Sequence, residues 1–139
     1  MNEHEEKLIA AFISKEKQGR YQFLLNSTDP KRRRECLGRL NHCSDLNEKY
    51  VTWLPRDPRS YTRNPEIAAV LKDKGSPSMV YVLACACDAD GKTMAVLDAM
   101  EETTVAGWGT IISCIPGELA YYYDEEGERR AILERKPGT

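Results

Sequence analysis

The sequence lacks a long apolar run and any segment typical of an export signal. No stretch approaches the roughly 18 consecutive apolar residues that a membrane span needs, and the opening MNEHEEKLIAAF carries charges where a secretory signal is apolar. We therefore expect a cytoplasmic protein without a membrane-spanning segment. The 139 residues, 41% of them hydrophobic and 30% charged, suit a single domain with its own core.

A disulfide framework is also lacking, because the cysteines are odd in number and irregularly spaced. We expect free thiols that pack as small hydrophobes. Cys85 and Cys87 would point to one face of a strand with Cys114 on another, so a thiol-dependent enzyme with His42 as its base stays an alternative. A structural zinc ion needs four ligands, commonly from paired cysteines, and His4 and His42 are the only histidines besides the thiols. We therefore expect no metal and no cofactor. The five cysteines are Cys36, Cys43, Cys85, Cys87 and Cys114.

Motifs of the easily recognised enzyme classes are absent. There is no phosphate-binding glycine loop, nucleophile elbow or His-Glu zinc-protease pattern. Residues 87–93, CDADGKT, share the start of a calcium loop, but Leu97 stands where that loop needs a glutamate. The acidic run around Asp124 falls at a hairpin tip, where carboxylates lack the shelter that acid–base chemistry requires. We assign no catalytic residue and expect a noncatalytic protein.

Helical periodicity dominates the first half of the chain. Its apolar residues keep one helical phase, which predicts one long helix or two collinear ones that break at Gly19. Glu16 and Arg20 would form an ion pair at the core edge. A second, short helix begins near Pro30, and Arg33 on its apolar stripe would reach solvent or pair with a glutamate such as Glu16. The apolar positions are Leu8, Ile9, Phe12, Ile13, Phe23 and Leu24.

The pattern of apolar residues in the second half of the chain is typical of β-strands. Residues 79–87 are apolar on both faces, which predicts a central strand with a layer packed on each side. Helices are predicted over residues 65–74, with Asn64 as the cap, and over residues 96–103. Three antiparallel strands are predicted over residues 109–115, 118–123 and 129–135. We therefore expect an α+β fold, in which the helical N-terminal half packs on a mostly antiparallel sheet of about four to five strands from the C-terminal half.

Periodicity disappears between Cys43 and Arg63, where only VTWL looks extended. Irregular segments of this length in a compact domain often carry a binding function. Charge is uneven too: residues 15–39 hold eight basic and three acidic side chains, and residues 88–128 hold one basic and ten acidic. The candidate binding residues are Arg32, Arg34 and Arg39 in the basic helix, and Trp53, Arg56, Arg59, Tyr61 and Arg63 in the segment that follows.

These residues suit two functions. We favour an interaction or regulatory module that binds a protein partner by complementary charge, with Trp53 and Tyr61 as aromatic anchors. The alternative is binding of a nucleic acid or phosphorylated ligand, because guanidinium groups pair with phosphate oxygens and bases stack on rings. The net charge of −2 and the acidic second half oppose a long polyanion. Trp108, between two glycines, would pack over the sheet edge or form the wall of a pocket.

Overall fold

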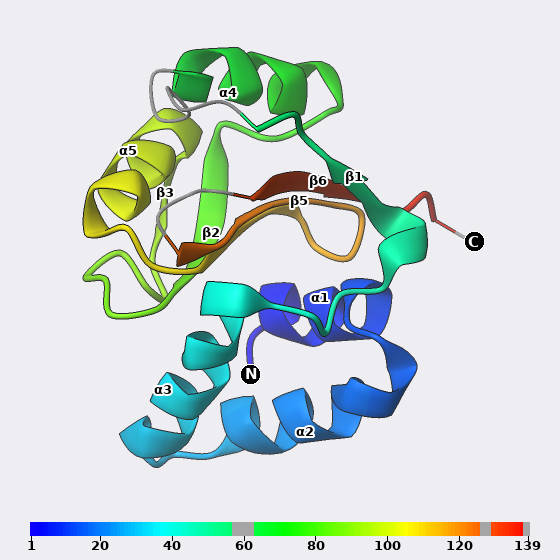
Figure 1. The fold of residues 1–139 in the computed structure, drawn as a ribbon, viewed down its shortest axis with the longest axis vertical. Helices are drawn as coiled ribbons and strands as arrows, with labels where there is room; N and C mark the ends of the chain where they lie inside the picture. Colours follow the sequence, from blue (N-terminus) through cyan, green and yellow to red (C-terminus); the bar gives the residue numbers. More distant parts are fainter. Residues whose placement is uncertain (57–62, 126–128, 138–139) are drawn as a thin grey trace.

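A single antiparallel sheet with helices on both faces organises the computed structural model (Figure 1). The structure describes residues 1–56, 63–125 and 129–137. Within these residues the sheet has six strands in the order β1-β6-β5-β4-β2-β3, and every neighbouring pair is antiparallel. The strands are β1 (Val51–Trp53), β2 (Met79–Ala84), β3 (Thr93–Ala95), β4 (Thr110–Ile115), β5 (Leu119–Tyr123) and β6 (Arg130–Glu134).

The helices form two layers, which confirms the α+β prediction and adds to it. The N-terminal helices cover one face of the sheet, and two helices from the second half of the chain cover the other. The first layer consists of α1 (Glu3–Phe12), α2 (Lys15–Asn26), α3 (Pro30–Gly38) and the short helix η1 (Arg39–His42). The second layer consists of α4 (Asn64–Asp73) and α5 (Val96–Ala106), and a further turn, η2 (Glu48–Tyr50), leads into β1.

Strand β5 shows why both faces must be covered. Side chains alternate between the faces of a strand, so Tyr122 enters the core under the N-terminal helices while Tyr121 and Tyr123 enter the core under α4 and α5. All three rings are buried, and the Tyr122 hydroxyl donates a hydrogen bond of 2.7 Å to the Leu40 carbonyl. Burying rings of this size accounts for a large part of the apolar stabilisation.

The strand predicted over residues 79–87 is an interior strand, but not the middle one. β2 lies between β4 and the edge strand β3, and it ends at Ala84. The chain then turns through Cys85 and Ala86, and Ala86 has a positive φ of 48°. The middle of the sheet is formed instead by β4 and β5, whose sequences are apolar on both faces.

The predicted break at Gly19 is wrong, because the helix breaks at Ile13 and Ser14. Ile13 has extended backbone and forms a β-bridge with Leu46, and the Ser14 N–H donates to a loop carbonyl. The apolar side chain of Ile13 continues the helical pattern even though its backbone does not. α2 then doubles back along α1 rather than continuing its axis (Figure 1), and Gly19 lies exposed inside α2.

The predicted ion pair between Glu16 and Arg20 is also replaced. The Arg20 guanidinium lies 2.6 Å from the carboxylate of Glu35 on α3. This contact joins two helices that pack side by side, whereas the predicted pair would have joined two turns of one helix. Both side chains are about half exposed, so the pair contributes little to stability.

Gly109 allows η1 to lie directly against the start of β4. A Cβ at this position would stand 2.2 Å from the carbonyl carbon of Leu40, which leaves no room for any side chain. The Gly109 N–H donates a 2.7 Å hydrogen bond to the side-chain oxygen of Asn41, and its carbonyl accepts from the Cys85 N–H. Gly109 therefore leaves space for the backbone of η1. Trp108, the residue before it, is 41% exposed.

We predict that Gly109→Ala destabilises the fold by at least about 2 kcal/mol, because the added methyl group meets rigid backbone. The matched control is Gly19→Ala, which places the same methyl group in open space within α2 and should stabilise by up to about 1 kcal/mol. Urea denaturation followed by circular dichroism measures both. A Gly109→Ala protein as stable as the wild type would contradict the close approach.

Candidate binding surface

The structure divides the predicted binding residues into two groups. The α3 and η1 arginines lie at the end of the helical layer away from β1 (Figure 1), where Arg32 packs over the ring of Phe23 and Arg39 lies 3.3 Å from the carboxylate of Asp45. Arg34 lines a cavity beside the turn that follows β2. The basic helix therefore does not extend the surface around Trp53.

The second group lies at the edge of the sheet. Trp53 belongs to β1 and is half-buried, Arg56 follows it, and Arg63 directly precedes α4. The predicted residues Arg59 and Tyr61 lie outside the described residues. In the segment from Cys43 to Arg63, the residues predicted to be extended form the edge strand β1, and the short helix η2 precedes it, which the sequence does not predict.

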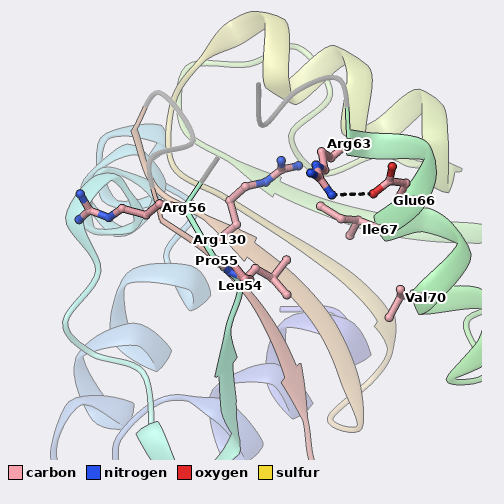
Figure 2. A pocket seen from close by; sticks show the side chains of 8 residues that line it. All are labelled: Leu54, Pro55, Arg56, Arg63, Glu66, Ile67, Val70 and Arg130. Atoms are coloured by element: carbon pink, nitrogen blue, oxygen red, sulfur yellow. Dashed lines mark hydrogen bonds and ion pairs between the residues drawn. The ribbon is translucent and has the colours of Figure 1, made fainter. Parts of the chain in front are cut away.

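A cavity of about 380 Å³ opens between the end of β1 and helix α4 (Figure 2). Its apolar lining comes from Leu54 on the sheet side and from Ile67 and Val70 on α4. Val70 is 41% exposed. The full lining consists of Leu54, Pro55, Arg56, Arg63, Glu66, Ile67, Val70 and Arg130.

The charged part of the lining is held by contacts within the protein. Arg130 is buried, and its guanidinium donates to the Tyr121 hydroxyl at 2.5 Å and to the Asn64 side-chain oxygen at 2.8 Å. Burial raises the pKa of Tyr121 above its ordinary value, so this hydroxyl stays neutral. Arg63 lies 3.1 Å from Glu66, whereas Figure 2 shows the Arg56 guanidinium extending away from the cavity.

A strip of cations stacked on aromatic rings lies on the other face of the same sheet edge. The Arg129 guanidinium lies 4.0 Å from the centre of the Trp53 ring, and the Arg135 guanidinium lies 4.5 Å from that of Tyr50. The Trp53 indole donates a 2.9 Å hydrogen bond to Glu48. The residues of this basic–aromatic strip are Lys49, Tyr50, Trp53, Arg129 and Arg135.

The cavity and the strip belong to opposite faces of one strand. Successive side chains of a strand point in opposite directions; Trp53 packs with the N-terminal core, and Leu54 packs with the core under α4 and α5. β1 thus separates an apolar cavity on one side from stacked cations on the other. Arg56, which follows this strand after Leu54 and Pro55, adds a further exposed cation.

The cysteines do not form a common site. Cys85 and Cys87 lie in the turn after β2 and pack against different cores, which overturns the prediction that they share one face of a strand. All five thiols are free. His42, the proposed base, places its Nε2 3.0 Å from Glu125. Within the described part of the chain, no three His, Cys, Asp or Glu residues are grouped to hold a metal ion.

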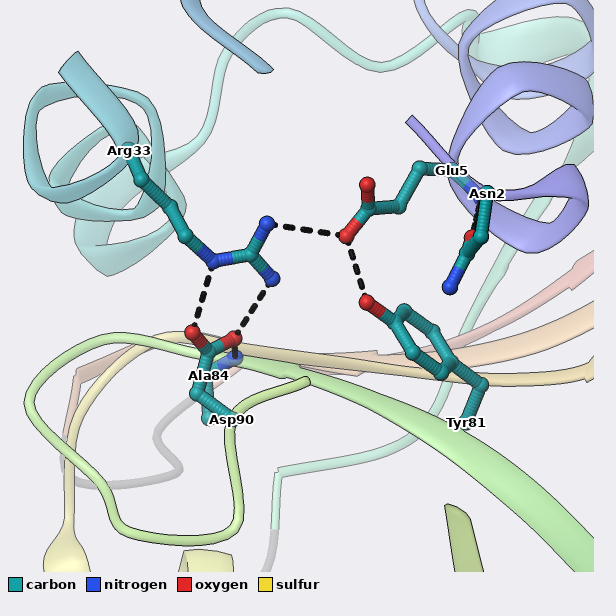
Figure 3. Close-up of polar contacts among 6 residues, drawn as sticks. All are labelled: Asn2, Glu5, Arg33, Tyr81, Ala84 and Asp90. Atoms are coloured by element: carbon teal, nitrogen blue, oxygen red, sulfur yellow. Dashed lines mark hydrogen bonds and ion pairs between the residues drawn. The ribbon is translucent and has the colours of Figure 1, made fainter. Parts of the chain in front are cut away.

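Arg33 is part of a partly buried ionic cluster that joins the two halves of the chain (Figure 3). Its guanidinium bonds both carboxylate oxygens of Asp90, at 2.8 and 3.1 Å, and one of Glu5, at 2.9 Å. The predicted partner Glu16 is therefore replaced by Glu5 and Asp90. Tyr81 donates to Glu5 at 2.5 Å, and the Ala84 N–H donates to Asp90 at 3.0 Å. These contacts give the cluster a structural role.

Comparison with protein-family models, with curated proteins and with solved structures gives no significant match. The geometry of the residues alone therefore carries the functional argument. Across residues 1–56, 63–125 and 129–137, no helix combines the length and the hydropathy that a bilayer crossing requires.

We predict that Arg33→Ala destabilises the protein by about 3 kcal/mol, because it leaves Glu5, which is only 3% exposed, and Asp90 without their counter-charge. Arg32→Ala, one residue away on the exposed side of α3, is the control and should change stability by no more than about 0.5 kcal/mol. Chemical denaturation of the two variants gives the comparison. Equal stabilities would exclude a structural role for the cluster.

Thiol labelling should divide the cysteines into two classes. Burial raises the pKa of Cys114 to about 11 and that of Cys36 to about 12, and it also raises the pKa of Cys43. We expect iodoacetamide at neutral pH to modify the half-buried Cys85 and Cys87 in the native protein and the other three only after unfolding. Mass spectrometry of the labelled peptides measures this. Fast native labelling of Cys114 would contradict the buried core.

Proposed function

We propose that this protein is a noncatalytic interaction module that binds an acidic segment of a protein partner at the β1 edge of its sheet. The observation that carries the proposal is the cavity of about 380 Å³ beside β1, which has an apolar lining next to a cluster of cations. Cavities of this size accommodate a small ligand or a few side chains.

The cavity supplies a place for an apolar anchor. Leu54, Ile67 and Val70 offer an aliphatic lining, and burying one leucine-sized side chain there contributes about 2 kcal/mol. The cations make the surface selective for an acidic partner. The guanidinium groups of Arg56 and Arg129 are exposed, and they match carboxylates in charge and geometry. An acidic segment with an apolar residue satisfies both requirements.

Two features favour an acidic protein segment over a nucleic acid. The arginines of α3 and η1 lie away from β1, so the surface does not offer the extended row of cations that follows a phosphate backbone. The rings of Trp53 and Tyr50 are already covered by Arg129 and Arg135, which leaves them less available for stacking with bases.

Fluorescence anisotropy with labelled probes tests the proposal. The probes are a short peptide with a central leucine flanked by glutamates, the same peptide with lysines, and a single-stranded oligonucleotide. We expect the protein to bind the glutamate peptide alone, and Arg56→Glu and Val70→Ser to weaken that binding by about tenfold or more each. Neither side chain is part of the core, so both variants should fold.

Arg32→Glu is the matched control, since it reverses the same charge at the far end of the helical layer and should leave peptide binding unchanged. Oligonucleotide binding that Arg32→Glu abolishes would instead support the alternative function. Failure of the glutamate peptide to bind, or binding that Arg56→Glu and Val70→Ser leave intact, would overturn the proposal.

A further inference from the structure

Within residues 1–56, 63–125 and 129–137, no strand pairs with the outer edge of β1, which lies between the cavity and the basic–aromatic strip. We infer that the acidic segment binds as an added β-strand along β1, with alternate side chains directed to the cavity and to the strip. This inference rests on the proposed function and specifies how the partner is held.

The pairing of β1 with β6 determines which backbone groups face outward. Thr52 pairs with Ile132, and the Leu54 N–H donates to the Arg130 carbonyl at 2.7 Å. In an antiparallel ladder the residues that exchange hydrogen bonds alternate with those that do not. Thr52 and Leu54 therefore face β6 with their backbone groups, and Val51 and Trp53 direct theirs away from the sheet.

Most of these outward groups are open to a partner strand. The Val51 N–H donates to the Glu48 carbonyl of η2. The Trp53 N–H and carbonyl and the Val51 carbonyl have no hydrogen-bond partner among the described residues. A peptide residue opposite Trp53 can exchange two hydrogen bonds with it, and a neighbouring peptide N–H can donate to Val51. This is the backbone component of β-strand addition.

Pro55 limits the length of strand that β1 can accept. The next outward N–H would belong to Pro55, which has none. Three backbone groups alone give a weak edge, a common protection against aggregation. Binding at this edge therefore depends on side chains, which makes it selective for a partner that suits both the cavity and the strip.

The pleat of the sheet assigns the side chains of the added strand. Residues opposite one another in neighbouring strands share a face, so the peptide residue paired with Trp53 lies on the strip side, next to Arg129. An acidic side chain suits that position. The adjacent peptide residue points to the face of Leu54, where the cavity takes an apolar side chain. The ligand is thus an extended segment with an acidic residue beside an apolar one.

Charge also excludes a second copy of this chain as the occupant. An antiparallel pairing of two β1 edges about Trp53 would bring the Arg129 that stacks on each Trp53 ring close to the Arg129 of the other molecule. Like charges placed together across an interface are unfavourable. An acidic peptide neutralises the same groups.

Amide hydrogen exchange, measured by NMR on the full protein with the glutamate–leucine peptide, tests strand addition. We expect the Trp53 amide to become protected by about tenfold or more when the peptide saturates the protein. Thr93 is the internal control, because the register of β3 directs its amide away from β2 at the opposite edge, and its exchange should not change.

N-methylation of the peptide supplies the second readout. Methylating the amide that pairs with Trp53 should abolish binding, whereas methylating the adjacent amide, which points to solvent, should be tolerated. If binding keeps its dependence on Arg56 and Val70 but the Trp53 amide stays unprotected and every N-methyl peptide binds, strand addition is rejected and the proposed function stands. If no glutamate peptide binds, both are rejected.

Discussion

The fold depends on a sheet that is apolar on both of its faces. Strands β4 and β5 bury every one of their side chains or nearly so, and consecutive residues such as Tyr121 and Tyr122 belong to different cores. Such a sheet is stable in water only between two covering layers. The N-terminal helices provide one layer and α4 with α5 the other. Polar contacts, including those of Arg33 with Glu5 and Asp90, fix how the first layer sits.

Local patterns in the sequence predict the longer elements well and the short ones poorly. Strands β2, β4, β5 and β6 and the helix from Val96 follow from alternation and turn residues, and the structure confirms them. The helix break at Ile13 depends on a bridge to Leu46, which no local signal announces. The extended residues predicted at VTWL form β1, where β6 supplies the hydrogen-bond partner. Strand β3 has only three residues, too few for a period to be recognised, and it exists because β2 offers it hydrogen-bond partners.

The candidate site shows the same limit. Trp53, Arg56 and Arg63 could be selected from composition, since rings and arginines cluster in an aperiodic segment. The cavity could not, because Leu54, Val70 and Arg130 come from three separate elements. Arg130 could be noticed in the sequence, because it is a charged residue directly before the three apolar residues 131–133, where it needs polar partners. The arginines of α3 and η1 suggest a binding surface by their number, yet Arg32 packs over Phe23 and Arg39 pairs with Asp45.

The covering of β4, β5 and β6 by helices from the beginning of the chain bears on how the protein is made. Helices α1, α2 and α3 leave the ribosome about a hundred residues before the strands they cover, which at roughly 5–20 residues per second is a delay on the order of ten seconds. During this time the apolar side chains of Ile9, Phe12 and Leu24 have no sheet to pack against. The nascent chain is thus a natural client for chaperones until its final hairpin has emerged.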